Sequence, residues 1–210
     1  MNEKTDICIV ASPEACGEAG TVSAMIFSTL CFLFWANGLG LLGSGATIAM
    51  AAFQLGAAAM YAYGGITHIK RGESFFGNVY IIFSVFFGAG AGALNLVGAI
   101  AEIKGFAYSW AVEGLMFLFV GIVVLAFLPH LVTWAISFFG IFLTGGLACV
   151  CWGIVYLGLL PGAAVVLNLI GSWSVFACGL LGTYTVLSTM FSYIGVKMDF
   201  LSWPLVAPKK

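Results

Sequence analysis

Charge is scarce in this chain, and its absence excludes several classes of protein. Only 7% of the 210 residues are charged, whereas soluble domains average about 25%. The formal net charge is -1, so the basic face that nucleic-acid binding requires is missing. Short alternating segments, which are typical of membrane β-barrels, are also absent. Neither a water-soluble domain, a nucleic-acid-binding protein nor a barrel is therefore expected.

Recognisable patterns for covalent chemistry or metal binding are lacking as well. The six cysteines do not have the spacing of a zinc site or a disulfide framework. Cys8 and Cys16 lie in the polar N-terminal region, and the other four lie in apolar runs, where a thiol behaves as a small hydrophobe. There is no Gly-x-Ser-x-Gly, no His-Glu-x-x-His and no phosphate-binding glycine loop. We therefore expect no enzyme activity, no cofactor and no metal.

Hydrophobic residues are abundant, at 62% of the chain. They form runs long enough to cross a bilayer, which takes about 20 residues of helix. Six apolar segments can be drawn, at about residues 22–43, 45–68, 75–100, 108–128, 131–157 and 163–194. The breaks carry glycine, charge or the Pro129–His130 pair, but the first and fifth are weak, so hydropathy alone also allows four or five crossings. The pattern predicts an all-α integral membrane protein.

Lysine and arginine indicate how such a protein is oriented. With six crossings, a polar N-terminal tail (1–21), a transmembrane domain (22–194) and a C-terminal tail (195–210) result. If the N-terminus is cytoplasmic, Lys104 is the only basic residue outside, and the inside holds Lys4, Lys70, Arg71, Lys197, Lys209 and Lys210. We expect a multi-pass cell-membrane protein with both termini in the cytoplasm. His68 and His130 then lie at cytoplasmic helix ends, where we expect them to meet water or headgroups.

Two features inside the predicted crossings suggest packing or function. Glu113 is the only carboxylate well inside a crossing, about one and a half turns into the fourth helix. Buried ionisable groups are costly and mark functional sites, so Glu113 is a candidate proton-sensitive group; the alternative is a position among the headgroups. Gly88 and Gly92 form a GxxxG pair, which predicts close helix packing and leaves open a backbone-lined pore.

Two stretches carry a resemblance to a known family. The first, "GGITHIKRGESFFGNVYIIFSVFF" (64–87), has a glycine pair, the basic pair Lys70 and Arg71, a glycine, two polar residues and Phe75, followed by an aromatic-rich crossing. The second is "SWSVFACGLLGTY" (172–184). Over about residues 22–190 the chain resembles the acetate uptake transporter family, whose members transport acetate and succinate. It departs from the family where the first crossing begins, because "EAGTVSAMIF" replaces the signature Asn-Pro-Ala-Pro-Leu-Gly-Leu.

The resemblance implies a structure and a pathway. Six helices would surround a pore in each protomer, and the protomers would form a homo-hexameric ring. A narrow apolar constriction would fall at Phe27, Phe83 and Ile141, with Phe83 in place of the family's tyrosine. The expected partners are a small carboxylate of the acetate class and the lipid bilayer.

An apolar constriction is physically suited to such a solute. It can hold back water and ions while a small, partly apolar molecule passes. The undissociated acid would cross more easily than its anion, which suggests transport coupled to protons. Two alternatives stay open: a channel for a small neutral solute such as urea, an amide or ammonia, because "FWANGLGLLG" (34–43) is similar to the first crossing of acid-gated urea channels, and a membrane protein that acts by assembly without transport.

Overall fold

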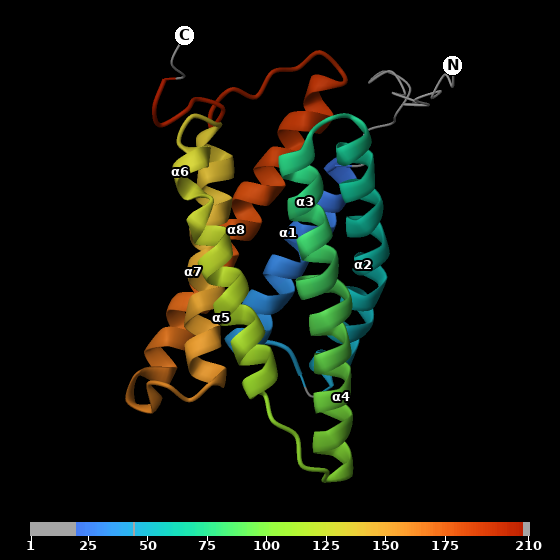
Figure 1. Cartoon of the computed structure of the whole chain (residues 1–210), viewed down its shortest axis with the longest axis vertical. Helices are drawn as coiled ribbons and strands as arrows, with labels where there is room; N and C mark the ends of the chain where they lie inside the picture. Colours follow the sequence, from blue (N-terminus) through green and yellow to red (C-terminus); the bar gives the residue numbers. More distant parts are fainter. Residues whose placement is uncertain (1–19, 44, 208–210) are drawn as a thin grey trace, which may run out of the picture.

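Six long helices form one bundle in the computed structural model, which describes residues 20–43 and 45–207 (Figure 1). Each is long and apolar enough to cross a membrane. Their bounds are Gly20–Gly38, Ala46–Lys70, Ser74–Lys104, Ala111–Leu131, Ile136–Tyr156 and Pro161–Ser192. No strand occurs in the described part of the chain. The all-α, six-span prediction is confirmed, whereas the N-terminal tail (1–21) lies almost wholly outside the described residues.

Three of the six spans are composite. The first two are single helices, α1 (Gly20–Gly38) and α2 (Ala46–Lys70), and the fifth is α7 (Ile136–Tyr156). The third consists of α3 (Ser74–Phe83), a π-helical segment η2 (Ser84–Gly90) and α4 (Ala91–Lys104). The fourth consists of α5 (Ala111–Ala126) and the short α6 (Leu128–Leu131). The sixth begins with a 3₁₀ turn, η3 (Pro161–Ala163), and continues as α8 (Ala164–Ser192).

Several helix ends differ from the expected ones by three to five residues. The first span ends at Gly38 instead of residue 43, and Gly40 follows with a φ of 69°, in the left-handed region that favours glycine. Pro129 does not interrupt the fourth span, because it lies in the first turn of α6, where its missing N–H costs little. Since α5 begins at Ala111, Glu113 lies in the first turn, not one and a half turns into the helix.

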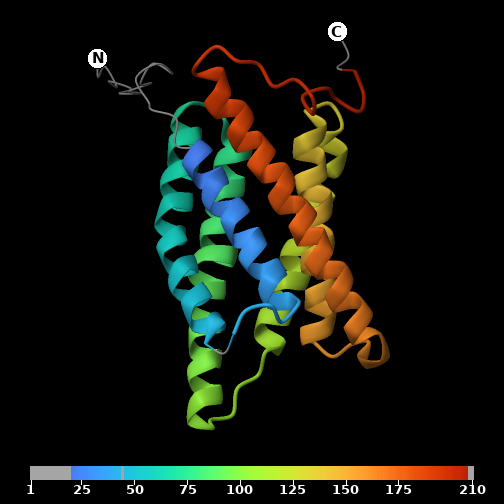
Figure 2. The same cartoon turned by 180° about the vertical axis from the view of Figure 1, so that it is seen from behind.

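The spans fall into two packed sets that α1 joins. In one set α2 packs against α3, η2 and α4, and in the other α7 packs against both α5 and α8. Viewed from behind, α1 lies between α2 and α8 (Figure 2) and contacts both. On the front, the backbones of the two sets approach most closely at η2 and α5. The Phe75 and Phe76 rings of α3 also contact rings of the other set at Phe127, Trp134 and Phe138. The candidate functional site described below lies between these two sets of helices.

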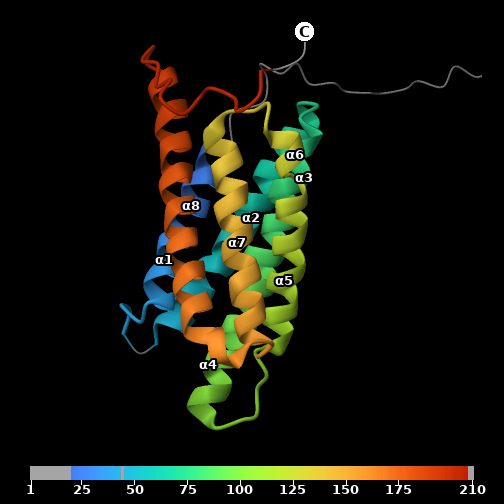
Figure 3. The ribbon, with the colours of Figure 1, turned by 90° about the vertical axis from the view of Figure 1, so that its left-hand side faces the viewer.

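The two ends of the bundle carry different connections. The α2–α3 turn, the α6–α7 turn, the start of α1 and the C-terminal segment lie at one end, called here the terminal end (Figure 1). The α1–α2, α4–α5 and α7–α8 connections lie at the opposite end, and α4 projects beyond its neighbours there (Figure 3). Both described chain ends therefore lie on the same side, as an even number of spans requires.

The GxxxG pair packs the third span closely against α2. A Cβ atom at Gly88 would lie 2.8 Å from Cα of Ala58, and one at Gly92 would lie 3.0 Å from Cβ of Gln54. Neither position has room for a side chain, so the packing interpretation of this pair is confirmed, and the contact lies within the protomer.

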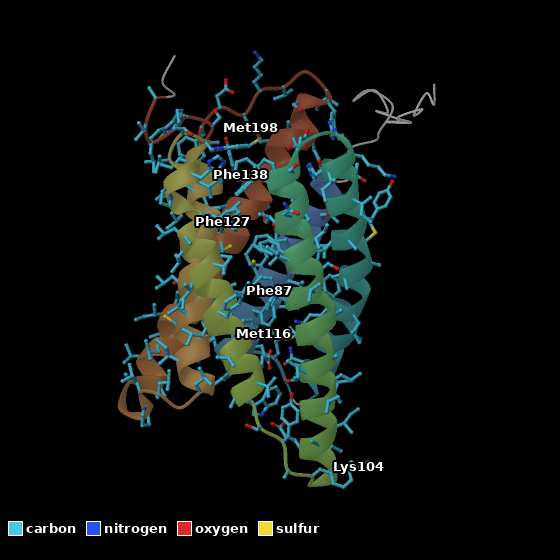
Figure 4. The ribbon with its side chains drawn as sticks, in the orientation of Figure 1. Phe87, Lys104, Met116, Phe127, Phe138 and Met198 are labelled. Atoms are coloured by element: carbon cyan, nitrogen blue, oxygen red, sulfur yellow. The ribbon has the colours of Figure 1, made fainter. Side chains whose placement is uncertain are left out.

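The C-terminal segment (196–207) folds back over the start of α7 at the terminal end, where Figure 4 labels Met198. The Tyr184 hydroxyl donates to the Met198 carbonyl (2.8 Å) and accepts from the Leu201 N–H (2.9 Å). The Ile136 N–H, in the first turn of α7, donates to the Trp203 carbonyl (2.9 Å). The segment thus satisfies a backbone donor that the helix itself cannot pair.

Replacing Tyr184 with phenylalanine should loosen this segment. The change removes two hydrogen bonds, each worth about 1 kcal/mol, so trypsin should cut after Lys197 up to about thirtyfold faster in detergent. Tyr193→Phe is the matched control, because Tyr193 is 63% exposed and its hydroxyl makes no hydrogen bond within the described residues. Equal cleavage rates for the two variants would show that Tyr184 does not hold the segment.

Candidate functional site

Three spaces follow one another along the bundle between its two sets of helices. An open vestibule of about 700 Å³ lies at the terminal end. A small central cavity of about 40 Å³ lies in the middle. A pocket of about 360 Å³ lies at the opposite end. Since a water molecule occupies roughly 10–15 Å³ on this measure, the central cavity has room for about three.

The charged α2–α3 turn forms part of the vestibule wall. His68 Nδ1 lies 2.5 Å from Glu73 Oε2, and Arg71 Nε lies 3.8 Å from the other oxygen of the same carboxylate. The His68 ring stacks on Tyr80, with centroids 5.2 Å apart, and the Tyr80 hydroxyl donates to the Gly20 carbonyl (3.2 Å). His68 is only 8% exposed, so the expectation that it meets water or headgroups is wrong. Sequence spacing does not reveal this pair.

Phe27, Phe83 and Ile141 lie at the boundary between the vestibule and the central cavity, because all three line both spaces, as does Phe142. They come from α1, α3 and α7, and the Phe27 and Phe83 rings stack with centroids 5.3 Å apart and planes at 14°. Phe83 and Ile141 are buried. The structure brings the three expected constriction residues together at one level; that they restrict a solute pathway stays a prediction.

The central cavity is apolar on all sides. Phe87, labelled in Figure 4 at the middle of the bundle, lines it together with Tyr61 and the thiols of Cys31, Cys149 and Cys178. Tyr61 is fully buried, and no group in the described ranges forms a hydrogen bond with its hydroxyl. Apolar cavities of this kind stay dry and accept small apolar molecules.

A second aromatic layer closes the central cavity toward the opposite end. The Phe34, Phe117 and Trp152 rings contact one another, with centroids between 5.8 and 6.3 Å apart. Sequence analysis did not predict this layer. A signal for it exists in α1, where Phe34 follows Phe27 by two helical turns and so lies on the same face.

The pocket at the opposite end, called here the polar pocket, lies one turn beyond this layer. Asn37 follows Phe34 on α1, and Tyr156 follows Trp152 on α7, each by about one turn. The full lining is Asn37, Thr47, Asn95, Trp110, Val155 and Tyr156. The spans thus supply amides and hydroxyls to this space, Trp110 directly before α5 supplies an indole, and none of the lining side chains is a base.

A chain of hydrogen bonds ties the polar pocket to η2. Asn95 Nδ2 donates to Gln54 Oε1 (2.9 Å), and Gln54 Nε2 donates to the Phe87 carbonyl (3.0 Å). Phe87 lies within η2, where the wider turn disturbs the regular α-helical hydrogen bonding. Gln54 is fully buried and Asn95 nearly so, so the third span and α2 share a satisfied polar link inside the bundle.

Glu113 lies near the polar pocket and not at the constriction. It is 1% exposed, and its Oε2 has no hydrogen-bond partner within residues 20–43 and 45–207. The next residue, Gly114, packs against Tyr156, since a Cβ there would lie 2.8 Å from Tyr156 Cβ. Burial, and to a smaller degree Glu113, raises the pKa of the Tyr108 hydroxyl. Glu113 is therefore enclosed by protein, and the alternative that it lies among headgroups is wrong.

Neither a metal-binding cluster nor a known relative assigns a function to these spaces. Among the described residues, no group of three His, Cys, Asp or Glu side chains could hold a metal ion. No model of a protein family matches the chain, and no curated protein matches it.

Proposed function

We propose that the chain transports acetate or a similar small monocarboxylate across the cell membrane, coupled to protons, as a member of the acetate uptake transporter family. One observation carries the proposal: Phe27, Phe83 and Ile141 line both the vestibule and the central cavity. Residues that the family resemblance assigns to a constriction thus lie at the boundary between two spaces on the axis of the bundle.

The size and chemistry of the central cavity support a small acid. Its volume of about 40 Å³ suits a molecule of very few heavy atoms, and its apolar wall can contact a methyl group. An isolated ionised carboxylate there would lose its hydration at a cost of several kcal/mol or more. Aromatic ring edges carry partial positive charge and offer weak compensation. The undissociated acid is the species that crosses this cavity at the lowest cost.

The distribution of basic residues supports both termini in the cytoplasm. The α2–α3 turn with Lys70 and Arg71 lies at the same end of the bundle as Lys197, and Figure 4 labels Lys104 at the opposite end. Under the positive-inside rule the terminal end faces the cytoplasm. The homo-hexameric ring remains part of the proposal on the family resemblance alone.

Uptake by proteoliposomes tests the proposal. Labelled acetate should enter liposomes that contain the chain several-fold faster than empty ones, and an inward proton gradient should increase the rate. Uptake no faster than in empty liposomes for acetate, formate, propionate and succinate alike would refute it. The uncharged polar pocket favours a second candidate, a channel for urea, an amide or ammonia; stopped-flow swelling in urea and in acetate separates the two.

Replacing Glu113 with glutamine should impair proton coupling. Glutamine keeps the shape of the side chain but cannot release a proton, so the increase of uptake under an inward proton gradient should be lost. The dependence of the rate on pH should also flatten. Glu102→Gln, at the exposed end of α4, is the matched control. A Glu113→Gln variant with the original rate and pH profile would remove Glu113 from the mechanism.

A further inference from the structure

The polar pocket presents hydrogen-bonding groups that the protein does not pair. Within residues 20–43 and 45–207, no hydrogen bond is made by the Asn37 amide, the Thr47 hydroxyl, the Trp110 indole N–H or the Tyr156 hydroxyl. The Asn95 Oδ1 atom likewise has no partner there. Five groups with unused capacity, four on helices and that of Trp110 directly before α5, therefore belong to residues that line a space of about 360 Å³.

The orientation of the Asn95 amide follows from its neighbours. The Phe87 carbonyl can only accept, so the Gln54 group bonded to it is the NH₂. Gln54 Oε1 is then the acceptor that faces Asn95, and Asn95 must donate to it from Nδ2. The oxygen of Asn95 is left toward the pocket, of which Asn95 is a lining residue. The pocket thus contains a fixed acceptor, Asn95 Oδ1, and a fixed donor, the Trp110 N–H.

The electrostatics of the pocket do not favour an anion. Its lining includes no lysine, arginine or histidine. At this end of the bundle, the ionisable groups on the elements around it are Tyr156 itself, Glu113 on α5, Tyr108 before α5, and Glu102 with Lys104 at the exposed end of α4. A carboxylate has only acceptors, so it could not use the Asn95 oxygen, and it would have no cationic partner among the lining residues.

We infer that the polar pocket binds the undissociated carboxylic acid, with the acid O–H donating to Asn95 Oδ1 and its carbonyl accepting from the Trp110 N–H. This inference rests on the proposed function and names the form of the solute that the pocket holds. With the terminal end in the cytoplasm, the pocket faces outside. The pocket then holds the solute with its proton attached.

Equilibrium binding to the purified full-length chain tests the inference. Labelled acetate and labelled acetamide are the probes, because acetamide has a donor and an acceptor but does not ionise in this range. The affinity for acetamide should stay constant between about pH 5 and 8. The apparent affinity for total acetate should fall about tenfold per pH unit, since only the neutral fraction binds. An acetate affinity that is independent of pH would overturn the inference, and so would acetamide that neither binds nor competes with acetate at low pH.

Two conservative variants connect binding to the named groups. Trp110→Phe removes the N–H and keeps a ring beside Tyr108 and Tyr156, which it contacts. It should weaken binding of both probes about fivefold, the loss expected for one hydrogen bond. Trp173→Phe, at a half-exposed position on α8, is the matched control and should bind as the unmodified chain does. A Trp110→Phe chain with unchanged affinity for both probes would show that the acid is not held at this pocket.

The outcomes for binding and for transport can be told apart. If acetate binds in proportion to its neutral fraction but is not taken up by liposomes, the transport function is refuted and the proposed binding site stands. If protons stimulate uptake but acetate binds with the same affinity at every pH, the proposed binding site is refuted and the transport function stands.

Discussion

Replacing Phe83 with alanine is expected to raise the uptake of carboxylic acids larger than acetate, such as butyrate, about tenfold relative to acetate. A snug apolar site discriminates roughly tenfold or more for each additional methylene. Loss of the Phe83 ring removes one member of the stacked pair with Phe27 and joins the vestibule to the central cavity. Competition of unlabelled acids against labelled acetate in proteoliposomes measures the change.

Phe119→Ala is the matched control, because Phe119 lies on α5 and is 60% exposed on the outer face of the bundle. Removing a buried ring costs about 3–5 kcal/mol, so size-exclusion and thermal unfolding must show that Phe83→Ala is folded. Phe83→Leu is a milder variant and should shift the preference in the same direction. If both folded variants keep the original order of preference among acids, the constriction does not lie at Phe83.

Replacing Gly153 with alanine is expected to lower the free energy of unfolding by about 3 kcal/mol, the upper end of the usual cost of overpacking. A Cβ atom at Gly153 would lie 2.6 Å from the Leu118 backbone nitrogen, 2.7 Å from its Cβ and 2.8 Å from its Cα. Backbone atoms cannot rotate aside, so α5 and α7 would have to move apart. The midpoint of thermal unfolding in detergent should fall by roughly 6–12 °C.

Gly56→Ala provides the comparison for this change. Gly56 also lies inside a membrane-spanning helix, but a Cβ there would meet nothing within 4 Å. Alanine favours a helix over glycine, so this variant should unfold at the same temperature as the unmodified chain or slightly above it. Equal midpoints for the two variants would mean that α5 and α7 are not packed as closely as described.

The helices were largely predictable because hydrophobic length is a strong signal, whereas their interruptions depend on local geometry. The apolar run at 75–100 indicates one span, but nothing in it distinguishes the π turn at Ser84–Gly90 from regular helix. Pro129 was expected to end the fourth membrane-spanning helix, since proline removes a backbone donor. It begins a new turn, because α6 starts there and needs no donor at that position.

The site was accessible from sequence only in part. Phe27, Phe83 and Ile141 follow from a family resemblance and not from spacing, since they are separated by many residues and meet only through the bundle. Glu113 was identified because a carboxylate in an apolar run is costly. The polar pocket could not be predicted, because amides at Asn37 and Asn95 pair helices as often as they face a cavity. Only the hydrogen bond from Asn95 Nδ2 to Gln54 Oε1 shows that Asn95 Oδ1 is the atom without a partner in the described residues.

The π turn also sets the rotational phase of the third span. In a regular α-helix, which turns about 100° per residue, the side chains of Phe83 and Asn95 would point about 120° apart. The wider turn at Ser84–Gly90 advances less per residue and brings both toward the interior. Regular helix over the same twelve residues would rotate Asn95 away from Gln54, whereas deleting one residue together with the π turn would keep Asn95 within about 20° of the direction of Phe83. The π turn thus lets a single helix serve the apolar boundary near one end and the amide link near the other.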